Sequence, residues 1–138
     1  MLGPMRPDEE AFVAKATKKS LRGAPPYDKL ANYEAYRRLN PEINEFLRVS
    51  RVIVARDPRN PTHAYGFAIY DVIPEALTVH FLYVAHDDRR DGIARTLLDT
   101  ILVDVPDDAD LEYTFPTARF KELATRYGFW CPNEEVCP

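Results

Sequence analysis

The stretch FLYVAHDDRRDGIARTLL, residues 81–98, decides the fold of this 138-residue chain. Its first four residues are apolar or aromatic, as is typical of a buried strand. Apolar residues recur at helical spacing from Ile93 to Ile101 and predict an amphipathic helix that ends near Val103. A polar loop that ends in Gly92 joins the two. Because a strand that enters a crossover helix leads to a parallel neighbour, the stretch favours an α/β fold.

The neighbouring sequence adds the other strands of the sheet. Residues 51–56, 64–71 and 76–84 are rich in β-branched and aromatic residues, and turn residues separate them. They predict an antiparallel meander. A short strand at residues 111–115 follows the predicted helix, so it should run parallel to the strand before it. The sheet is therefore predicted to be mixed and mostly antiparallel.

Helices are predicted before and after these strands. Apolar spacing, with glycine and proline as breakers, places the predicted helices at residues 8–21, 27–39, 42–47 and 117–127. Pro41 is expected to separate the second helix from the third, and Gly128 to close the last one. The order of elements predicts a layered α/β domain over residues 1–138.

Composition excludes several classes of protein. With 46% hydrophobic, 29% charged and 12% aromatic residues, the chain is neither disordered nor collagenous nor fibrous. Its apolar runs are far shorter than the ~18 residues of a membrane span, so we expect a cytoplasmic protein without membrane contact.

Charge and cysteine content bear on the partners. Residues 1–52 carry ten Lys and Arg against seven Asp and Glu, whereas residues 53–138 carry eight against fifteen. A polyanion such as DNA would therefore meet the basic N-terminal third.

Cys131 and Cys137 are too few for a zinc site, so we expect reduced thiols and no metal, with a disulfide as the alternative.

The loop before the central helix has the features of an anion site. The first turn of a helix presents backbone N–H groups and the positive end of the helix dipole. Gly92 and Ala94 are small enough to let a phosphate approach these donors closely. A glycine before a helix also occurs in proteins that bind no anion, so the pattern alone leaves both readings open.

Two motifs point to one family. Arg89-x-x-Gly92-x-Ala94 matches the (Gln/Arg)-x-x-Gly-x-(Gly/Ala) signature of the GNAT N-acyltransferase superfamily, and the Gly128-Phe129 pair is similar to the end of that family's later helix. The resemblance covers residues 51–129. It implies a three-layer fold with helices on both faces of the sheet, and an acetyl-CoA-dependent N-acyltransferase that needs no metal.

The resemblance also implies where coenzyme A would bind. The backbone of Leu82 and Val84 would pair with the pantetheine arm. The pyrophosphate would lie on the segment that opens the helix, formed by Arg89, Arg90, Asp91, Gly92, Ile93, Ala94 and Arg95.

His80 and Tyr83 are the catalytic candidates. Regular alternation puts His80 on the same strand face as Leu82 and Val84, and its unperturbed pKa of about 6.5 suits a general base. It resembles the strand histidine of arylalkylamine-type members. Tyr83, on the opposite face, is the candidate acid. The alternatives are a histidine that is hydrogen-bonded within the sheet and a tyrosine that packs as a core ring.

The chain also departs from the family pattern. Ala124 and Thr117 stand where many members have a tyrosine acid and an asparagine. Tyr127 lies one residue before Gly128 and is expected to point elsewhere, so it does not replace the missing acid. This leaves a GNAT-shaped binding module without catalysis as an alternative.

A looser resemblance concerns the N-terminal third. Residues 16–22 and the Pro26-Tyr27 step are similar to small phage-encoded GNAT-fold proteins related to Mom-type DNA-modification proteins. That resemblance implies adenine in DNA as the acceptor. The sheet edge and the tail are further expected to support a homodimer.

Overall fold

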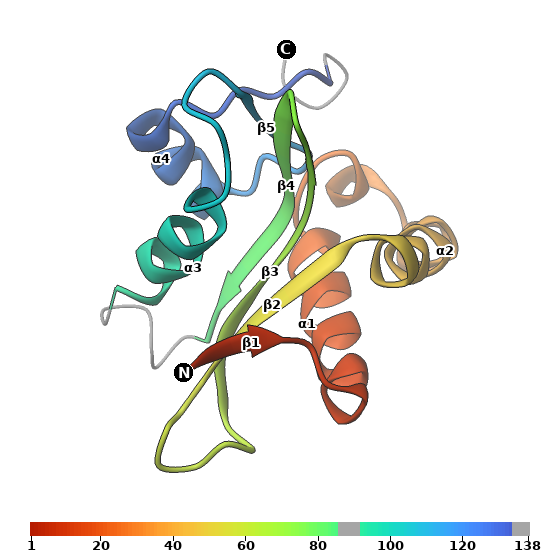
Figure 1. Cartoon of the computed structure of the whole chain (residues 1–138). Helices are drawn as coiled ribbons and strands as arrows, with labels where there is room; N and C mark the ends of the chain where they lie inside the picture. Colours follow the sequence, from red (N-terminus) through yellow and green to blue (C-terminus); the bar gives the residue numbers. More distant parts are fainter. Residues whose placement is uncertain (86–91, 134–138) are drawn as a thin grey trace.

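A computed structural model describes residues 1–85 and 92–133, which form a five-stranded sheet between two layers of helices (Figure 1). The strands lie in the order β1-β2-β3-β4-β5. The strands are β1 Leu2–Pro4, β2 Arg51–Arg56, β3 Ala64–Ile73, β4 Ala76–Val84 and β5 Asp110–Tyr113. The helices are η1 Pro7–Glu9, α1 Glu10–Arg22, η2 Tyr27–Lys29, α2 Asn32–Val49, α3 Ile93–Leu102 and α4 Ala118–Tyr127.

The strand pairing confirms the mixed sheet. Strands β1 to β4 pair antiparallel, each with the next along the chain. β5 pairs parallel to β4, because α3 carries the chain back across the sheet before β5 begins. The three-layer α/β fold implied by the family resemblance is therefore present.

The sheet separates two hydrophobic cores. Alternate residues of each strand point to opposite faces, so each face needs its own cover. α3 and α4 cover one face, where Leu97, Leu98 and Phe120 are buried against the sheet. α1 and α2 cover the other, with Leu21 and Ile43 buried. The N-terminal third thus forms one wall of the domain (Figure 1).

A β-bulge interrupts the regular alternation of β4. Phe81 pairs with Ile69 and Val79 pairs with Tyr70, so His80 is the extra residue between them. After the bulge, Leu82 and Val84 lie in the core under α3 and α4. His80 stacks on Phe46 of α2, on the opposite face. The prediction that His80 shares a face with Leu82 and Val84 is therefore wrong, because one inserted residue reverses the alternation.

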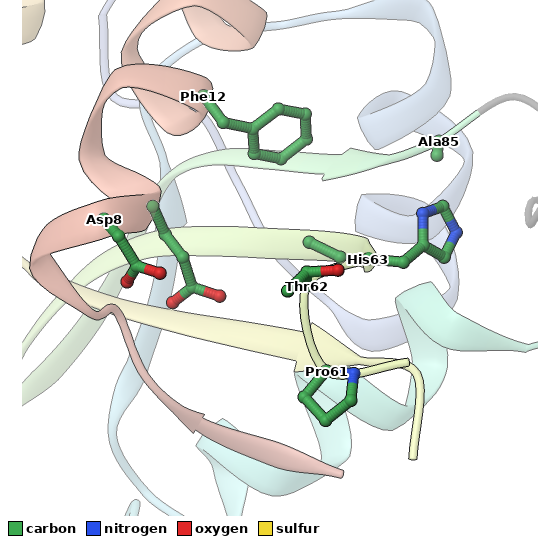
Figure 2. A pocket seen from close by; sticks show the side chains of 8 residues that line it. Asp8, Phe12, Pro61, Thr62, His63 and Ala85 are labelled. Atoms are coloured by element: carbon green, nitrogen blue, oxygen red, sulfur yellow. The ribbon is translucent and has the colours of Figure 1, made fainter. Parts of the chain in front are cut away.

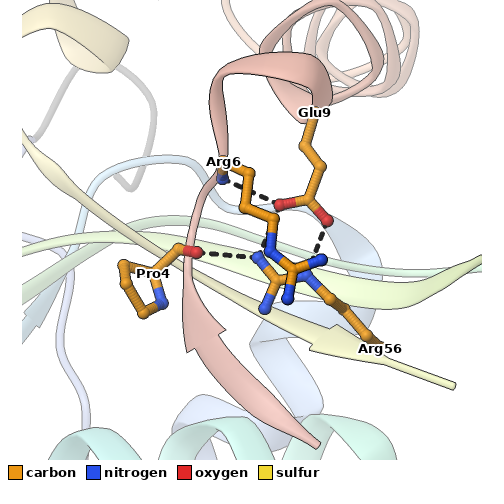
Figure 3. Close-up of polar contacts among 4 residues, drawn as sticks. All are labelled: Pro4, Arg6, Glu9 and Arg56. Carbon is orange, nitrogen blue, oxygen red and sulfur yellow. Dashed lines mark hydrogen bonds and ion pairs between the residues drawn. The ribbon is translucent and has the colours of Figure 1, made fainter. Parts of the chain in front are cut away.

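An N-terminal strand that the sequence analysis missed is held by a buried ion pair (Figure 3). Arg56, whose side chain is 3% exposed, donates from Nε and Nη2 to the Glu9 carboxylate at 2.7 and 2.5 Å. Its Nη2 also donates to the Pro4 carbonyl oxygen at 2.7 Å. The hydrogen bonds from Arg56 hold the pKa of Glu9 below its usual value. This cluster ties β1 and η1 to the end of β2.

α2 is also longer than predicted. It continues through Pro41, where two separate helices were expected. Ala35, Leu39 and Ile43 are fully buried at four-residue spacing on both sides of the proline, while Pro41 itself is exposed. Burial of this stripe therefore offsets the hydrogen bond that Pro41 cannot donate.

Three further observations concern the described residues. Cys131 is disulfide-bonded, so the expectation of reduced thiols is wrong in this structure; the only other cysteine, Cys137, lies outside the described part of the chain. None of the helices in residues 1–85 and 92–133 is both long and apolar enough to cross a bilayer. Within the same residues, no group of three His, Cys, Asp or Glu side chains is placed to hold a metal ion.

Candidate active site

The two parallel strands part half-way along β4. Their last pair is Val79 with Tyr113, and the Thr114 N–H still donates to the Val79 carbonyl oxygen at 3.1 Å. β5 then ends, whereas β4 continues for five more residues to Val84. The second half of β4 therefore keeps its antiparallel ladder with β3 on one side and opens on the other.

A narrow slot lies along this open side. Its volume is about 150 Å³. The lining comes from α1, from the second half of β4 and from the start of α4; the residues are Ser20, Phe81, Leu82, Tyr83, Val84, Thr117 and Arg119. The slot thus lies between the parted strand and the N-terminus of α4.

Backbone groups of β4 face the slot in a fixed order. The Ala85 N–H donates to the Tyr65 carbonyl oxygen at 2.8 Å, so the backbone of Ala85 points toward β3. Residues two apart on a strand point their hydrogen-bonding groups to the same side. The backbone groups of Tyr83 therefore also face β3, and those of Leu82 and Val84 face the side that β5 has left.

α3 begins near the end of the same strand, with a backbone suited to an anion. Gly92 is its N-cap at φ 71°, and as a glycine it has no side chain to cap the helix. A Cβ added at Gly92 would meet no atom of the described residues within 4 Å. The Thr96 N–H donates to the Gly92 carbonyl oxygen, so the N–H groups of Ile93, Ala94 and Arg95 belong to the first turn, where helices have no internal acceptor. Arg89, Arg90 and Asp91 lie outside the described residues.

His80 occupies the point where β4 and β5 part. Its Nδ1 lies 2.6 Å from the Thr114 Oγ1, and its Nε2 lies 2.7 Å from Oδ2 of Asp71 on β3. The ring stacks on Phe46, with centroids 4.4 Å apart, and only 12% of the side chain is exposed. Both ring nitrogens are therefore engaged within the protein.

Tyr83 lies in an aromatic group on the α1 side of the sheet. Its ring stacks on Phe67 at 5.2 Å between centroids and meets the edge of Phe12 at 6.1 Å. It also lines the slot. The core-ring role and the slot-lining role are thus both present at this residue.

Two of the hollows that are larger than the slot have charged side chains in their lining. One, of about 510 Å³, contains Asp8 and Glu9 with Phe12 and His63 (Figure 2). Its two carboxylates disfavour an anionic ligand. The other, about 610 Å³, lies between α1 and α2; its lining includes Lys15, Lys18, Lys19, Tyr36 and Asn40. The slot, although smaller, is the hollow that meets the parted strands, so we take it as the candidate active site.

Comparison with known proteins agrees with this geometry. No protein-family model matches the sequence, and no curated protein matches it. Solved structures do match. The ribosomal-protein-alanine N-acetyltransferase from Brucella melitensis biovar Abortus 2308 superposes with a TM-score of 0.60 at 20% identity, over 92% of this chain and 89% of that one. The chain has the GNAT fold.

Two further structures support that assignment. A histone acetyltransferase HPA2 and related acetyltransferase from Corynebacterium glutamicum matches with a TM-score of 0.62 at 14% identity, over 93% of this chain and 83% of that one. A protein from Desulfovibrio desulfuricans, assigned to the GNAT family of acetyltransferases, matches with a TM-score of 0.57 at 20% identity, over 90% and 82%. At these identities the likeness establishes the fold.

The GNAT positions where this chain departs from the pattern lie in different surroundings. Thr117 lines the slot and caps α4 through a hydrogen bond from the Phe120 N–H at 3.3 Å. Ala124 is 4% exposed in the core under α3 and α4. Tyr127 donates its hydroxyl to Asp99 of α3 at 2.9 Å, so it points away from the slot as expected.

Sequence reasoning missed the residues around His80. Asp71 and Thr114 come from different strands, 9 and 34 residues away in the chain. No local motif connects them, and the bulge that brings them together breaks the alternation on which the sequence analysis relied. The only signal in the sequence was the polar character of the two residues, Asp71 on β3 and Thr114 directly after β5.

Proposed function

We propose that the protein is an N-acyltransferase that transfers an acetyl group from acetyl-CoA to an amine. The observation that carries the proposal is the separation of β4 from β5 after Val79. It leaves an open strand edge, a slot along it, and beyond it the start of α3, whose N-cap is a glycine. An extended ligand with amide groups at one end and a pyrophosphate at the other needs these three features in this order.

The chain's own groups suit such a ligand. The backbone groups of Leu82 and Val84 face the slot and can pair with the amides of a pantetheine arm. The N–H groups of Ile93, Ala94 and Arg95 can donate hydrogen bonds to the pyrophosphate oxygens, and the helix dipole favours an anion there. Acetyl-CoA, when bound, supplies an activated thioester. The narrow slot restricts the arm to one extended path.

Proton transfer is assigned to residues at the parting point. An amine must lose a proton as it attacks the thioester, and we assign the acceptance of that proton to His80, which Asp71 orients. Tyr83 lines the slot and is the candidate donor to the leaving sulfur. Ala124 is buried in the other core, so its position offers no route for an acid.

The test is binding of coenzyme A to matched tryptophan variants. Ser20→Trp fills the mouth of the slot from an exposed position on α1, and Lys19→Trp adds the same bulk one residue away, outside the slot. Coenzyme A at 100 times its Kd should stabilise the wild type and Lys19→Trp by about 2.7 kcal/mol. Ser20→Trp should lose this shift. No shift in the wild type would leave only the binding-module interpretation.

A second candidate, an amine carried on DNA, is favoured by the groove between α1 and α2. Lys15, Lys18 and Lys19 line it, and Tyr36 adds an aromatic ring. Cations beside an aromatic ring suit a nucleic acid backbone and its bases. A gel shift at 50 and 200 mM salt tests this candidate: salt-sensitive binding that is lost in Lys15→Glu/Lys18→Glu supports it. Equal binding by this variant contradicts it.

A further inference from the structure

We infer that Phe81 sets the size of the acyl group that the protein transfers, and that its ring restricts the donor to acyl groups of two or three carbons. The inference rests on the proposed function, because it takes an acyl-CoA bound along β4 as the donor. It assigns a specificity-determining residue to the slot and leaves the direct transfer from thioester to amine as proposed. Phe81 is one of the residues that line the slot.

Phe81 lies at the inner end of the slot. Of the β4 residues in the lining, it comes first along the strand, just beyond Val79, where β4 and β5 part. The arm of a ligand whose pyrophosphate lies at the start of α3 would enter at the opposite end, beside Val84. Three residues of strand span about 10 Å from Val84 to Phe81. The arm carries its acyl group at the end far from the pyrophosphate, so the acyl group meets Phe81.

The β-bulge turns the Phe81 side chain toward α1 and α2. Consecutive side chains of a regular strand point to opposite faces. His80, as the extra residue of the bulge, lies on the α2 side against Phe46, and Phe81 is buried in the core on that same side. The residue assigned to accept the amine proton and the inner wall of the slot are therefore neighbours on one face of β4.

The Phe81 ring is held so that it cannot retreat from a ligand. The residue is 5% exposed, and its ring centroid lies 6.0 Å from that of Phe67, which is fully buried. Phe67 is itself stacked on Tyr83 at 5.2 Å and meets the edge of Phe12 at 6.0 Å. Protein interiors are close-packed, and an added methylene is accommodated only by strain in the surrounding side chains. A longer acyl chain therefore meets a fixed wall.

The slot has little volume to spare for a longer chain. Its volume is about 150 Å³, the share of about five water molecules in the liquid. The end of the arm and the acyl group must divide that space. The other walls come from Ser20 of α1 and from Thr117 and Arg119 at the start of α4. A hexanoyl group adds four methylene groups to acetyl, and these would have to displace Phe81 or one of these walls.

Binding of a series of acyl-CoA thioesters tests the inference without knowledge of the acceptor. Titration calorimetry gives the Kd of the wild type for coenzyme A and for its acetyl, butyryl and hexanoyl thioesters. We expect butyryl-CoA to bind at least tenfold more weakly than acetyl-CoA, and hexanoyl-CoA more weakly still, because one methylene at a tight apolar wall changes discrimination by roughly tenfold or more. Phe81→Leu should bring butyryl-CoA within about threefold of acetyl-CoA, and Phe81→Ala should do the same for hexanoyl-CoA.

The controls separate acyl size from folding and from binding of the arm. Each Kd is divided by that of coenzyme A on the same variant, so a loss that affects the whole ligand cancels. Phe129→Leu makes the same change in the core under α3 and α4, outside the slot lining, and should keep the wild-type ratios.

Two results would overturn the inference and leave the proposed function intact. One is equal affinity of the wild type for acetyl-CoA and hexanoyl-CoA, since the longer chain would then leave the slot past Ser20. This measurement needs no variant, so it decides even where a substitution in the core prevents folding. The other is a set of ratios unchanged in both Phe81→Leu and Phe81→Ala. Absence of coenzyme A binding by the wild type would instead sink the proposed function itself.

Discussion

The two sides of β4 differ along its second half. Toward β3, the ladder runs from Ile73 paired with Ala76 to Gly66 paired with Val84. Toward β5, it stops at Val79 paired with Tyr113. On one side the same strand is paired along its whole length except at the His80 bulge, and on the other its second half is an open edge. We call the side of β4 that faces β3 the closed side, and the side that β5 leaves after Val79 the open side. Pairing on the closed side holds the strand in place, and so fixes the backbone groups that face the open side.

This difference predicts that substitutions on the two sides of β4 affect different properties, the stability of the fold on one side and coenzyme A binding on the other. Substitutions on the closed side should lower the free energy of unfolding and affect coenzyme A only through the fold. Substitutions on the open side should affect coenzyme A at little cost in stability. The predictions at Gly66 and Gly92 test the two halves of that statement, and those at Glu9 and Tyr127 give the stability effect of contacts outside β4 for comparison.

The largest effect is expected at Gly66, on the closed side. A Cβ there would lie 2.3 Å from the Tyr83 carbonyl oxygen, and backbone cannot yield as a flexible side chain can. Gly66→Val should lower the free energy of unfolding by on the order of 4 kcal/mol, measured in urea. Gly23→Ala, whose Cβ would meet nothing within 4 Å, is the control and should stay within about 0.5 kcal/mol.

The buried ion pair gives the next effect. Glu9→Gln leaves the Arg56 guanidinium, 3% exposed, without its counter-charge and should cost about 3 kcal/mol. The pKa of Glu9 is lowered in the folded protein. Its contribution is therefore complete above the unfolded value near 4.5 and is lost as the pH falls through the lower, folded value.

Unfolding curves between pH 7 and pH 3 check this. The wild type should lose more stability than Glu9→Gln in the acid range. Glu10→Gln, at the first residue of α1, should behave as the wild type does. Parallel curves for the wild type and Glu9→Gln would contradict the assignment of the pKa shift to Arg56.

Local sequence predicted one side of β4 better than the other. β2 and β4 match the predicted residues 51–56 and 76–84, because β-branched and aromatic runs bounded by turn residues are strong local signals. β5 was predicted at residues 111–115 but ends at Tyr113. The end of this strand is set by where its pairing with β4 stops, and the composition of the segment does not show that point. β1, with three residues and a proline, exists only through its pairing with β2.

The candidate site, like the sheet, could be predicted from the sequence only in part. A recognisable motif located the start of α3, and strand position located Leu82 and Val84. The bulge at His80 is a property of register between two strands, and register is set by packing over the whole sheet. Asp71 and Thr114 therefore join the site only when the strands are paired.

The open side is tested by two glycines in the same backbone conformation. Gly92 at φ 71° and Gly128 at φ 82° both have open space where a Cβ would lie. Alanine at either should cost about 1 kcal/mol of left-handed strain. Gly92→Ala should also weaken coenzyme A binding by about tenfold, or 1.4 kcal/mol, because its methyl would occupy the anion approach. Titration calorimetry on both variants decides; equal loss of affinity would show that helix strain alone is responsible.

The smallest effect is expected at Tyr127, whose hydroxyl joins α4 to Asp99 of α3 at 2.9 Å. Burial and Asp99 raise the pKa of this phenol, so the protonated form is favoured in the folded state. Tyr127→Phe removes one hydrogen bond between partly exposed groups and should cost about 0.5–1 kcal/mol at pH 7. That difference should vanish as the pH rises through the folded pKa. Tyr33→Phe is the control, because Tyr33 is 80% exposed, and it should not change the free energy of unfolding. Because neither Tyr127 nor Asp99 lines the slot, coenzyme A affinity should be unchanged. A tenfold loss would mean that the spacing of these two helices sets the width of the slot.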